Sequence, residues 1–585
     1  MPENFVETPR KNEKDDAIQY VKKLLVQARE DNRNEDIEKL EELVRLLHTK
    51  KYGLVWEEHA EIVEEEMKTK IPVFVEDAGR KIVGNPDSED YNFLLEGDNL
   101  HSLHLLEKTH SGKIDVIYID PPYNTGNKDF IYNDKIVDKT DGYSHSKWLS
   151  FMSKRLEIAR NLLSDKGVIF ISIDDNEQAQ LKLLCDEIFG EINFLTQFII
   201  ENNPKGRKNS KFSSVTSEYC IAYSKNSELA YFVENIPKAS SDMRLDDEGN
   251  YVHSSGRRVI VGQNNFNKIV SNFLSDKHYS FYFRKQDRSY KFIKEDSIDN
   301  VDNVLLNQGF IRYISYRNGV FVENTYTQRK LEELLQNYAL DFTDDKIYEK
   351  NFRSTIRIKN LLINRKYEAI VDNKKQEFEI DLKTTSAKQQ LAKIFGGKSP
   401  FDYPKNIGLI KLLLTLNDSK DMTVLDFFAG SGTTGHAVTQ LNKEDGGNRK
   451  YILCTNNENR IAEEVTYKRL SNIQSDLPHN LKYFKTDFVD KMEFPDFTLE
   501  SELLNYITPL VELEFGIDIS NPSVQIILTE EHLEALLQNH ELQAGATLFI
   551  HPDVFLDTKE QEQLSELQIT LQEIPDYFFG KELWS

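Results

Sequence analysis

Two short apolar runs, far apart in the chain, each end at a group of polar and turn-forming residues. Ile114–Ile119 is followed by Asp120-Pro121-Pro122-Tyr123, and Thr423–Leu425 is followed by Asp426-Phe427-Phe428-Ala429-Gly430-Ser431-Gly432. Both runs have the composition of buried strands. Because open α/β sheets place their ligand sites where strands end, the pattern predicts that both polar segments lie at ligand-binding positions.

The two ends of the chain have different patterns. Between Asp15 and about Lys70 the sequence is charged and poor in glycine, and apolar residues recur every three or four positions, which predicts helices. The last hundred residues contain the apolar runs Val524–Leu528 and Ala546–Ile550. These runs predict a folded α/β domain rather than a disordered acidic tail.

Length and cysteine content limit the class of protein. A chain of 585 residues is expected to form three or four domains. The three cysteines, Cys185, Cys220 and Cys454, are far apart and form no Cys-x-x-Cys pair, which argues against a disulfide framework and against a structural zinc. We therefore expect no metal site. The N-terminus has no signal segment, and no apolar run approaches membrane-spanning length, so we expect a cytoplasmic protein.

The net charge of −24 is unevenly distributed. From Thr486 to Ser585 there are 3 Lys or Arg residues against 21 Asp or Glu residues, so this region carries −18 and the rest of the chain carries −6. An acidic domain repels DNA, which predicts either a surface for protein contacts or a domain that caps the rest of the fold.

Asp120-Pro121-Pro122-Tyr123 is the more specific of the two motifs. Two consecutive prolines fix the backbone and remove two N–H donors, which leaves carbonyls beside a carboxylate and an aromatic ring. The alternative is a rigid loop with a solvated Asp and a packed Tyr. In the second motif, Gly430 and Gly432 allow a tight turn, and a helix beginning near Thr433 would offer free N–H groups; a simple turn or another kind of nucleotide site is the alternative.

Asp120–Asn124 and Phe428–Gly432 resemble motifs IV and I of the S-adenosylmethionine-dependent amino-methyltransferases of DNA, in the circularly permuted order of the β class. The chain also resembles the modification (Mod) subunits of Type III restriction-modification systems, over roughly residues 50 to 480. The further matching stretches are Leu94–Leu100, Trp148–Arg155, Gly167–Asp175, Phe401–Lys405 and Tyr451–Glu458. The resemblance implies an α/β fold with a permuted Rossmann-like core and S-adenosylmethionine as cofactor.

The resemblance also implies a strand order. The chain would supply the third strand of the sheet at 93–98, the fourth at 114–120, a helix at 146–163 and the fifth strand at 168–174. After an excursion to about residue 399, it would return with the first strand at Thr423 and the second at 451–455.

Cofactor residues follow from this strand assignment. Asp98 is expected at the cofactor's adenine, Asp426 near its methionine end, and Asn456 or Glu458 at its ribose. The spacing of 32 residues between Asp426 and Glu458 is longer than the usual spacing of about twenty, which leaves both ribose candidates open. The remaining expected cofactor residues are Phe428, Gly430, Gly432, Thr433 and Lys405, with the Lys405 charge directed at the methionine carboxylate.

The expected catalytic residues are Asp120, Pro121, Pro122 and Tyr123. If the Asp120 carboxylate and the Pro121 carbonyl accept the two amine hydrogens of adenine, the nitrogen lone pair is directed at the sulfonium methyl, and direct displacement follows. Tyr123 would face a target base flipped out of the duplex. Asp at the first position resembles adenine-N6 enzymes, whereas Ser commonly marks cytosine-N4 enzymes. Methylation of cytosine C5 requires a nucleophilic cysteine, and none lies beside either motif.

Sequence recognition is expected between the two catalytic halves, at residues 231–394, because this excursion is too long for a loop. The segment interleaves basic and aromatic residues, and its candidate DNA contacts are Arg257, Arg258, Arg353 and Arg357. A basic loop at 203–211 adds Lys205, Arg207, Lys208 and Lys211. For any single one of these residues, a solvated surface position is the alternative.

These observations give one interpretation. The expected domains are a helical region at 1–85, catalytic halves at 86–230 and 395–485, a target-recognition domain at 231–394, and an acidic α/β domain for protein contacts at 486–585. The expected function is site-specific adenine-N6 methylation of double-stranded DNA. The resemblance further implies a homodimer and a restriction (Res) helicase-nuclease partner. The alternatives are a solitary adenine methyltransferase, a cytosine-N4 methyltransferase, and a DNA-recognition subunit with little catalysis.

Overall fold

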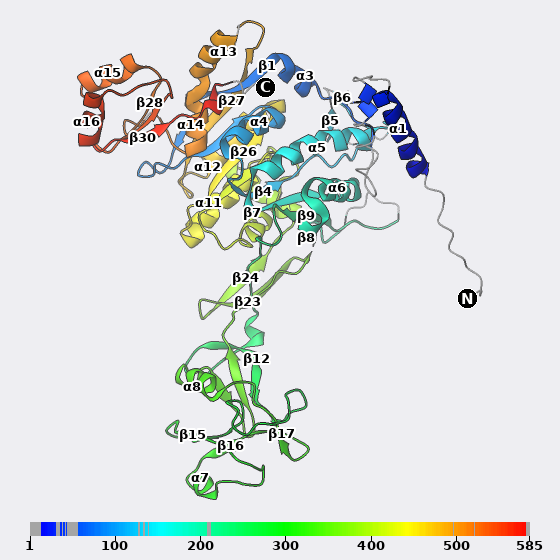
Figure 1. The fold of residues 1–585 in the computed structure, drawn as a ribbon, viewed down its shortest axis with the longest axis vertical. Coiled ribbons are helices and arrows are strands. Elements are labelled where there is room, and N and C mark those ends of the chain that lie inside the picture. Colours follow the sequence, from blue (N-terminus) through cyan, green and yellow to red (C-terminus); the bar gives the residue numbers. More distant parts are fainter. Residues whose placement is uncertain are drawn as a thin grey trace. The chain divides into compact units, whose positions relative to one another are not determined.

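The computed structural model describes residues 13–30, 36–37, 39–40, 43, 56–126, 129–132, 135–138, 140–206, 212–494, 496–519 and 521–580. The chain divides into two compact units (Figure 1). The first comprises Met1–Gln197, Glu218–Ala230 and Asp421–Ser585, and the second comprises Phe198–Ser217 and Tyr231–Lys420. The first unit is therefore assembled from three separate stretches of sequence.

A twisted sheet forms the centre of the first unit. Eight of its strands are consecutive in space, in the order β1 (Lys70–Glu76), β27 (Asn480–Asp490), β3 (Asn92–Glu96), β26 (Lys450–Thr455), β25 (Thr423–Asp426), β4 (Ile114–Ile119), β7 (Leu163–Ile173) and β9 (Glu218–Ser224). The strands from β27 to β7 are parallel, whereas β1 and β9 pair antiparallel. Numbered as the sequence predicts, the central strands run 3-2-1-4-5, the order of a doubly wound sheet. The permuted Rossmann-like core is confirmed.

The strands form where the sequence places continuous apolar runs. Of the six residues of β4, five are buried, as are the last three of β25, and both strands lie in the middle of the sheet. Helix α5 (Ser144–Leu162) matches the helix expected at 146–163, and α11 (Thr433–Asp445) begins at the expected Thr433. Helix α4 (Asn99–His110) follows β3 and packs against α5.

The N-terminal region is helical at α1 (Glu13–Glu30) and at α3 (Ile62–Thr69). The prediction of helix is wrong for residues 56–61, which have no regular structure. This segment is held in place by contacts to α5: the backbone N–H of His59 donates to Ser150, and Glu61 caps α3 while pairing with Arg155. From Lys70 onward the chain forms the edge strand β1.

The acidic C-terminal region folds as an α/β structure. Strands β28 (Val524–Ile527), β29 (Thr547–Ile550) and β30 (Thr570–Glu573) form a parallel sheet with α15 (Glu530–Gln538) and α16 (Thr558–Glu566). Helix α14 (Ile507–Phe515) contributes buried residues to the core of the first unit and contacts α4. Lys482 is buried in an ionic cluster with Glu512 and Asp518, so part of the acidity neutralises an internal lysine.

The second unit has its own core of aromatic and aliphatic residues around β14 (Ser280–Phe283) and α8 (Gln328–Gln336). Strand β14 lies between β15 (Tyr290–Ile293) and β16 (Ile311–Tyr313), and β12 (Tyr251–Ile260) pairs with β20 (Ile347–Asn351).

The second unit extends beyond the expected recognition segment at 231–394. It continues through α9 (Thr384–Ile394) and α10 (Ile407–Leu414) to Lys420. The side chain of Asn235 donates to the carbonyl of Leu412, and the N–H of Val233 donates to that of Leu416. These hydrogen bonds attach the later segment to residues that begin the excursion.

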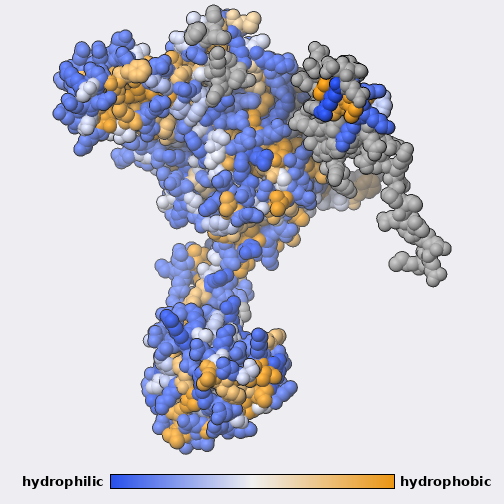
Figure 2. Space-filling view, viewed as in Figure 1, coloured by the Kyte–Doolittle hydropathy of each residue, from blue (hydrophilic) through white to orange (hydrophobic). Residues whose placement is uncertain are grey.

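Most of the face shown in Figure 2 is hydrophilic, with apolar patches on both units. Among the described residues, no helix combines the length and apolar character required to cross a membrane. In the same part of the chain, no group of three His, Cys, Asp or Glu side chains is arranged to hold a metal ion.

Candidate functional site

The Asp120-Pro121-Pro122-Tyr123 loop directly follows β4, as the sequence predicts. The Tyr123 hydroxyl donates to Asp120 Oδ1 at 2.9 Å, and Glu218 Oε2 from β9 lies 3.5 Å from the same hydroxyl. The indole N–H of Trp148 donates to the Pro122 carbonyl at 2.7 Å. Among the described residues, the Pro121 carbonyl accepts no backbone hydrogen bond from a turn or loop. The loop is thus held in place through the Pro122 carbonyl, while the Pro121 carbonyl is a potential hydrogen-bond acceptor.

A buried carboxylate supports the residue that follows this loop. Asn124 adopts a left-handed backbone conformation, with φ of 55°, and its side-chain amide donates to Glu177 Oε1 at 2.5 Å. His145 Nδ1 lies 2.7 Å from the same oxygen. Glu177 is fully buried, its Oε2 atom has no hydrogen-bond partner in the described structure, and burial raises its pKa. The strained backbone at Asn124 is therefore anchored by the Glu177 carboxylate, whose burial is energetically unfavourable.

The glycine loop follows β25 and leads into α11. Gly430 and Gly432 have φ of 48° and 71°, which L side chains rarely adopt, and the chain requires glycine there. Thr466 donates to the Gly430 carbonyl at 2.6 Å. The buried guanidinium of Arg469 donates to the Ser431 carbonyl at 3.1 Å and to Thr433 Oγ1 at 2.7 Å, and burial lowers its pKa to about 9.

Asp426 lies at the base of this loop. Its carboxylate accepts hydrogen bonds from the Phe428 N–H at 3.0 Å and from the Thr434 hydroxyl at 2.5 Å. The pKa of Asp426 is raised to about 7: burial is the main cause and the nearby Asp120 carboxylate adds to it, while the two hydrogen bonds act in the opposite direction. The structure therefore brings the acidic residues of the two motifs within electrostatic range, although they are about three hundred residues apart in sequence.

Asp98 caps the N-terminus of α4 by accepting the Leu100 N–H at 2.8 Å. It also contacts Arg155, which is fully buried and donates to Asn99 Oδ1 at 2.6 Å and to Glu61 Oε1 at 2.8 Å. The Asn99 amide in turn donates to the Phe427 carbonyl at 2.8 Å. One hydrogen-bonded network therefore joins the end of β3 to the glycine loop.

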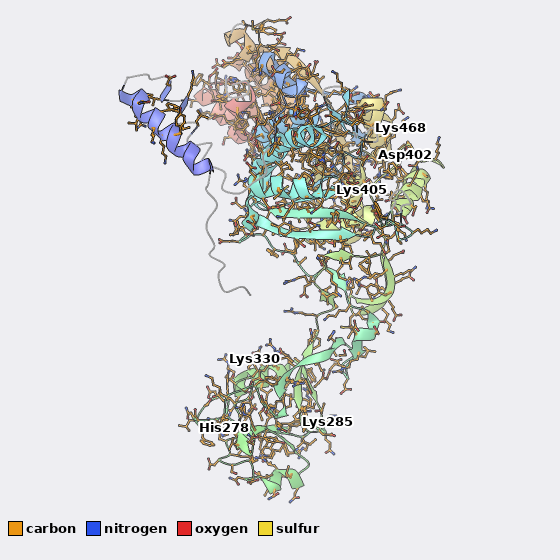
Figure 3. All side chains as sticks on the ribbon, turned by 90° about the vertical axis from the view of Figure 1, so that its right-hand side faces the viewer. His278, Lys285, Lys330, Asp402, Lys405 and Lys468 are labelled. Atoms are coloured by element: carbon orange, nitrogen blue, oxygen red, sulfur yellow. The ribbon has the colours of Figure 1, made fainter. Side chains whose placement is uncertain are left out.

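The other expected cofactor residues lie in different environments. The Phe428 ring packs against Phe151, with centroids 5.8 Å apart. Asn456 and Glu458 both lie exposed just beyond β26. Their positions do not show which of them is the ribose-binding residue. Lys405 belongs to the second unit, directly before Asn406, which caps α10 (Figure 3).

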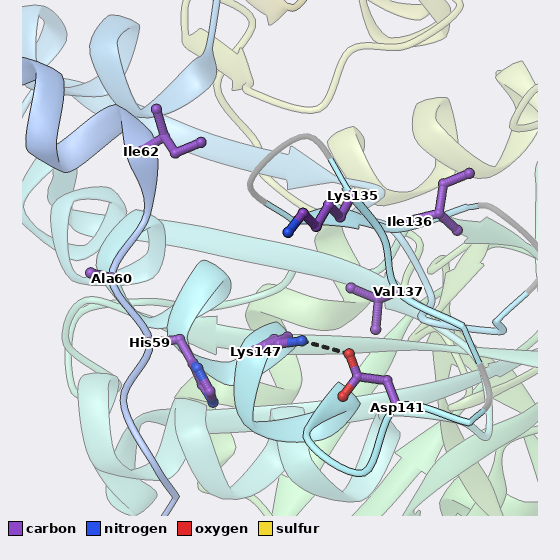
Figure 4. Close-up of a pocket in the computed structure, with 8 residues that line it drawn as sticks. All are labelled: His59, Ala60, Ile62, Lys135, Ile136, Val137, Asp141 and Lys147. Atoms are coloured by element: carbon purple, nitrogen blue, oxygen red, sulfur yellow. Dashed lines mark hydrogen bonds and ion pairs between the residues drawn. The ribbon is translucent and has the colours of Figure 1, made fainter.

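A cavity of about 520 Å³ lies beside the first turn of α5 and strand β6 (Lys135–Ile136) (Figure 4). Its lining includes His59, Lys135, Val137, and the ion pair of Lys147 with Asp141, whose N···O distance is 2.5 Å. Lys147 directly precedes Trp148, which holds the Pro122 carbonyl. Residues of the Asp120–Tyr123 loop and of the glycine loop are not among those that line this cavity.

All the described candidate DNA contacts are exposed and lie in the second unit: Lys205, Arg257, Arg258, Arg353 and Arg357. The guanidinium of Arg257 donates to the Tyr326 hydroxyl at 3.1 Å, and that of Arg353 lies 3.7 Å from Glu234. The candidates Arg207, Lys208 and Lys211 lie outside the described residues.

Sequence analysis did not assign roles to Glu177, Glu218, Arg155 or Arg469. Trp148–Arg155 was recognised only as a stretch of resemblance, and Glu177 is only three residues beyond the predicted fifth strand. Glu177 could have been found from its position: it is an acidic residue shortly after a strand, and helix α6 (Gln178–Cys185) begins at the next residue. Ligand-binding residues commonly occupy such positions in α/β sheets.

Comparison with known proteins identifies relatives of the chain. A family model described as "DNA methylase" matches residues 114–466. The chain is 31% identical to the StyLTI Mod subunit of a Type III restriction-modification enzyme from Salmonella typhimurium, over 66% of this chain and 56% of that subunit. It is also 31% identical to the EcoPI Mod subunit of Escherichia phage P1, over 65% of this chain and 62% of that subunit. The matched regions thus cover less than two thirds of either relative.

Two further proteins align with the chain over most of their own length. The Type II methyltransferase M.KpnI of Klebsiella pneumoniae is 32% identical, over 68% of this chain and 88% of that protein. The solved structure of the PvuII DNA methyltransferase, described as cytosine-N4-specific, aligns with a TM-score of 0.29 and 12% identity, over 67% of this chain and 95% of that one.

Proposed function

The chain belongs to the DNA methylase family, and from this premise we propose that it transfers a methyl group from S-adenosylmethionine to N6 of adenine in double-stranded DNA. One observation carries the proposal. The Asp120 loop and the Asp426 loop follow adjacent parallel strands, β4 and β25, and their carboxylates are electrostatically coupled. The proposed amine acceptor and the proposed cofactor loop thus both follow the carboxyl ends of strands, the edge where such sheets bind ligands.

The residues present suit a cationic cofactor. Among the described residues, the groups acting on the Asp426 carboxyl are a hydroxyl, a backbone N–H and the Asp120 carboxylate, with no cation. A positively charged ligand would stabilise both carboxylates. Asp426 and the glycine loop would hold the methionine part of S-adenosylmethionine, and Asp98 the adenine. When bound, this cofactor supplies an electrophilic methyl group on a sulfonium sulfur.

Asp120 and the Pro121 carbonyl are suited to activate the acceptor. Each accepts one hydrogen of the adenine amine, which directs the nitrogen lone pair away from the ring plane. A carboxylate has two oxygens with several lone pairs, so Asp120 can accept the amine and the Tyr123 hydroxyl together. When N6 gains a methyl group it must lose one proton, and Asp120 is the group placed to receive it.

We propose that DNA is bound by the second unit. Lys and Arg exceed Asp and Glu by 9 in that unit, whereas the rest of the chain carries a net charge of −33. Such a basic unit attracts the phosphate backbone. The target base would be flipped out of the duplex to reach Tyr123. By analogy with the Mod subunits, a homodimer and a restriction partner complete the proposal.

The test is transfer of radiolabel from S-adenosylmethionine to plasmid DNA, followed by nucleoside analysis. Asp120→Ala is the test variant. Asp165→Ala is the matched control, because Asp165 is an exposed carboxylate near the start of β7, the strand beside β4. Labelled N6-methyladenine in the wild type and in Asp165→Ala, with none in Asp120→Ala, is the expected result. N4-methylcytosine as the product would refute the assignment of adenine.

A further inference from the structure

An exposed apolar loop in the second unit has no role in the proposed chemistry. Residues 264–276, here called the apolar loop, connect β13 (Gly262–Gln263) to the segment leading into β14. Its large apolar side chains are strongly exposed: Phe266 at 85%, Leu274 at 80%, Ile269 at 51% and Phe273 at 44%. Four such residues in one short segment are unusual on a soluble surface and indicate an interaction.

The first half of the apolar loop is held rigidly. The side-chain oxygen of the buried Asn264 accepts the N–H groups of Phe266 and Asn267, at 2.9 and 3.1 Å. The guanidinium of Arg317 donates to the carbonyls of Asn265 and Asn267, both at 3.1 Å. The backbone that carries Phe266 is therefore fixed from both sides.

The second half is anchored by other residues. Lys294 Nζ donates to the carbonyl of Leu274 at 2.6 Å, and the side chain of Asn272 accepts the Leu274 N–H at 2.9 Å. The Phe273 ring meets the buried His278 edge to face at 5.0 Å, and Figure 3 labels His278 in this unit. Between the two halves, the Val270 N–H donates to the Phe321 carbonyl at 3.0 Å.

Rigid display of apolar side chains lowers the entropic cost of binding, because the loop is already ordered. Within and just beyond the loop, Lys268 and Lys277 are exposed, and the unit as a whole carries +9. Apolar side chains flanked by lysines match a duplex, whose stacked bases are apolar and whose phosphates are anionic. Proteins insert Phe and Leu between base steps in this way, and base stacking on aromatic rings also contributes to affinity.

We propose that the apolar loop is a DNA wedge: Phe266 and Leu274 enter between base steps of the bound duplex, while Lys268 and Lys277 contact the flanking phosphates. The proposal rests on the proposed function, since it takes double-stranded DNA as the ligand. It adds a contact that distorts the duplex outside the methyl-transfer site.

The test separates apolar from ionic contacts by their salt dependence. Binding of a fluorescein-labelled duplex pool of random sequence is measured by anisotropy at several salt concentrations. One variant carries Phe266→Ser and Leu274→Ser, a second carries Lys268→Ala and Lys277→Ala, and the control is Val304→Ser. Val304 is 65% exposed in α7 (Asn303–Asn307) of the same unit, so it is likewise an exposed apolar side chain, outside the apolar loop.

The wedge residues should contribute affinity without releasing counterions. We expect the Phe266→Ser, Leu274→Ser variant to bind about tenfold or more weakly at every salt concentration, with an unchanged slope of log K against log salt. The Lys268→Ala, Lys277→Ala variant should lose up to about 2 from the magnitude of that slope. Val304→Ser should match the wild type. Melting curves of all variants confirm folding, since every substituted side chain is exposed.

Two outcomes overturn the wedge. Unchanged DNA affinity in the Phe266→Ser, Leu274→Ser variant shows that the loop does not contact DNA, as expected if it binds a protein instead. Weaker binding with a reduced salt slope shows an ionic contact only. Methyl transfer, measured on the same preparations, separates the two proposals: a wild type that binds DNA through the loop but transfers no methyl group refutes the proposed activity and retains the wedge.

Discussion

Replacement of Asp426 by Asn should stabilise the protein and weaken its cofactor binding at the same time. The carboxyl has an ordinary pKa of 3.8 and a native pKa of about 7, because it is buried. The native state therefore holds the proton more tightly than the unfolded state does. The resulting stability is fully present below pH about 4 and is lost as the pH rises through about 7.

The magnitude follows from these two pKa values. Ionised Asp426 costs the native state up to about 4 kcal/mol at pH 8, at about 1.4 kcal/mol for each tenfold change in proton affinity. Asn has nearly the same shape, remains neutral, and can keep contacts to Phe428 and Thr434. The gain in unfolding free energy of Asp426→Asn over wild type should therefore grow from near zero at pH 4 to about 2 to 4 kcal/mol at pH 8.

The assay is urea unfolding between pH 5 and pH 8, followed by tryptophan fluorescence. Trp56 and Trp148 belong to the first unit, so their signal reports the unit that contains Asp426, and the third tryptophan, Trp584, lies outside the described residues. Asp165→Asn is the control, because it removes an exposed carboxylate of the same unit and should leave stability nearly unchanged at every pH. Parallel pH profiles for Asp426→Asn and wild type would refute the reasoning.

Cofactor binding should change in the opposite direction. The neutral amide offers no charge to a cationic ligand, and a hydrogen bond to a charged group contributes about 1.5 to 3 kcal/mol. Calorimetric titration with S-adenosylmethionine at pH 8 should therefore show a Kd at least tenfold higher for Asp426→Asn. An unchanged Kd in a stabilised variant would place the cofactor away from Asp426.

Three further substitutions test the support of the site. Arg155→Leu should lower the free energy of unfolding by about 3 to 5 kcal/mol in urea titrations, because it leaves the buried Glu61 carboxylate without its partner. Glu177→Ala should reduce kcat for methyl transfer more than it raises KM for DNA, because Asn124 loses its anchor, and Glu177→Gln should restore part of kcat. Trp148→Phe should cost about 1 to 3 kcal/mol of stability in thermal melts by leaving a loop carbonyl unpaired, and wild-type stability in this variant would show that the indole hydrogen bond is dispensable.

The strand order could be predicted from sequence because each strand combines a local pattern with a local ending. Ile114–Ile119 is continuous and apolar, and its ending is marked by two prolines. The start of α11 is equally local, since Gly432 in a left-handed conformation must precede it. Features of this kind depend on residues that are neighbours in sequence.

The support of the site depends on contacts that no local pattern reveals. Arg155 and Glu61 are 94 residues apart, and a charged side chain in a sequence normally indicates an exposed position. Glu61 also lies in a segment whose composition favours helix, yet it is the N-cap of α3, in a capping box with Glu64, and its carboxylate pairs with Arg155. These tertiary contacts lie in a segment, residues 56–61, for which the sequence predicts helix and the structure has no regular element.

Charge distribution makes the proposed DNA binding compatible with an acidic protein. The net charge of −24 combines about −33 in the first unit with +9 in the second. Encounters of a duplex with the acidic unit are disfavoured by repulsion, whereas encounters with the basic unit are favoured, and both effects weaken as salt rises. Net charge alone is thus a poor guide to the ligand of this chain. Removing the second unit's exposed arginines one at a time should reduce the salt dependence of DNA binding, even though each change makes a protein that is already acidic more acidic still.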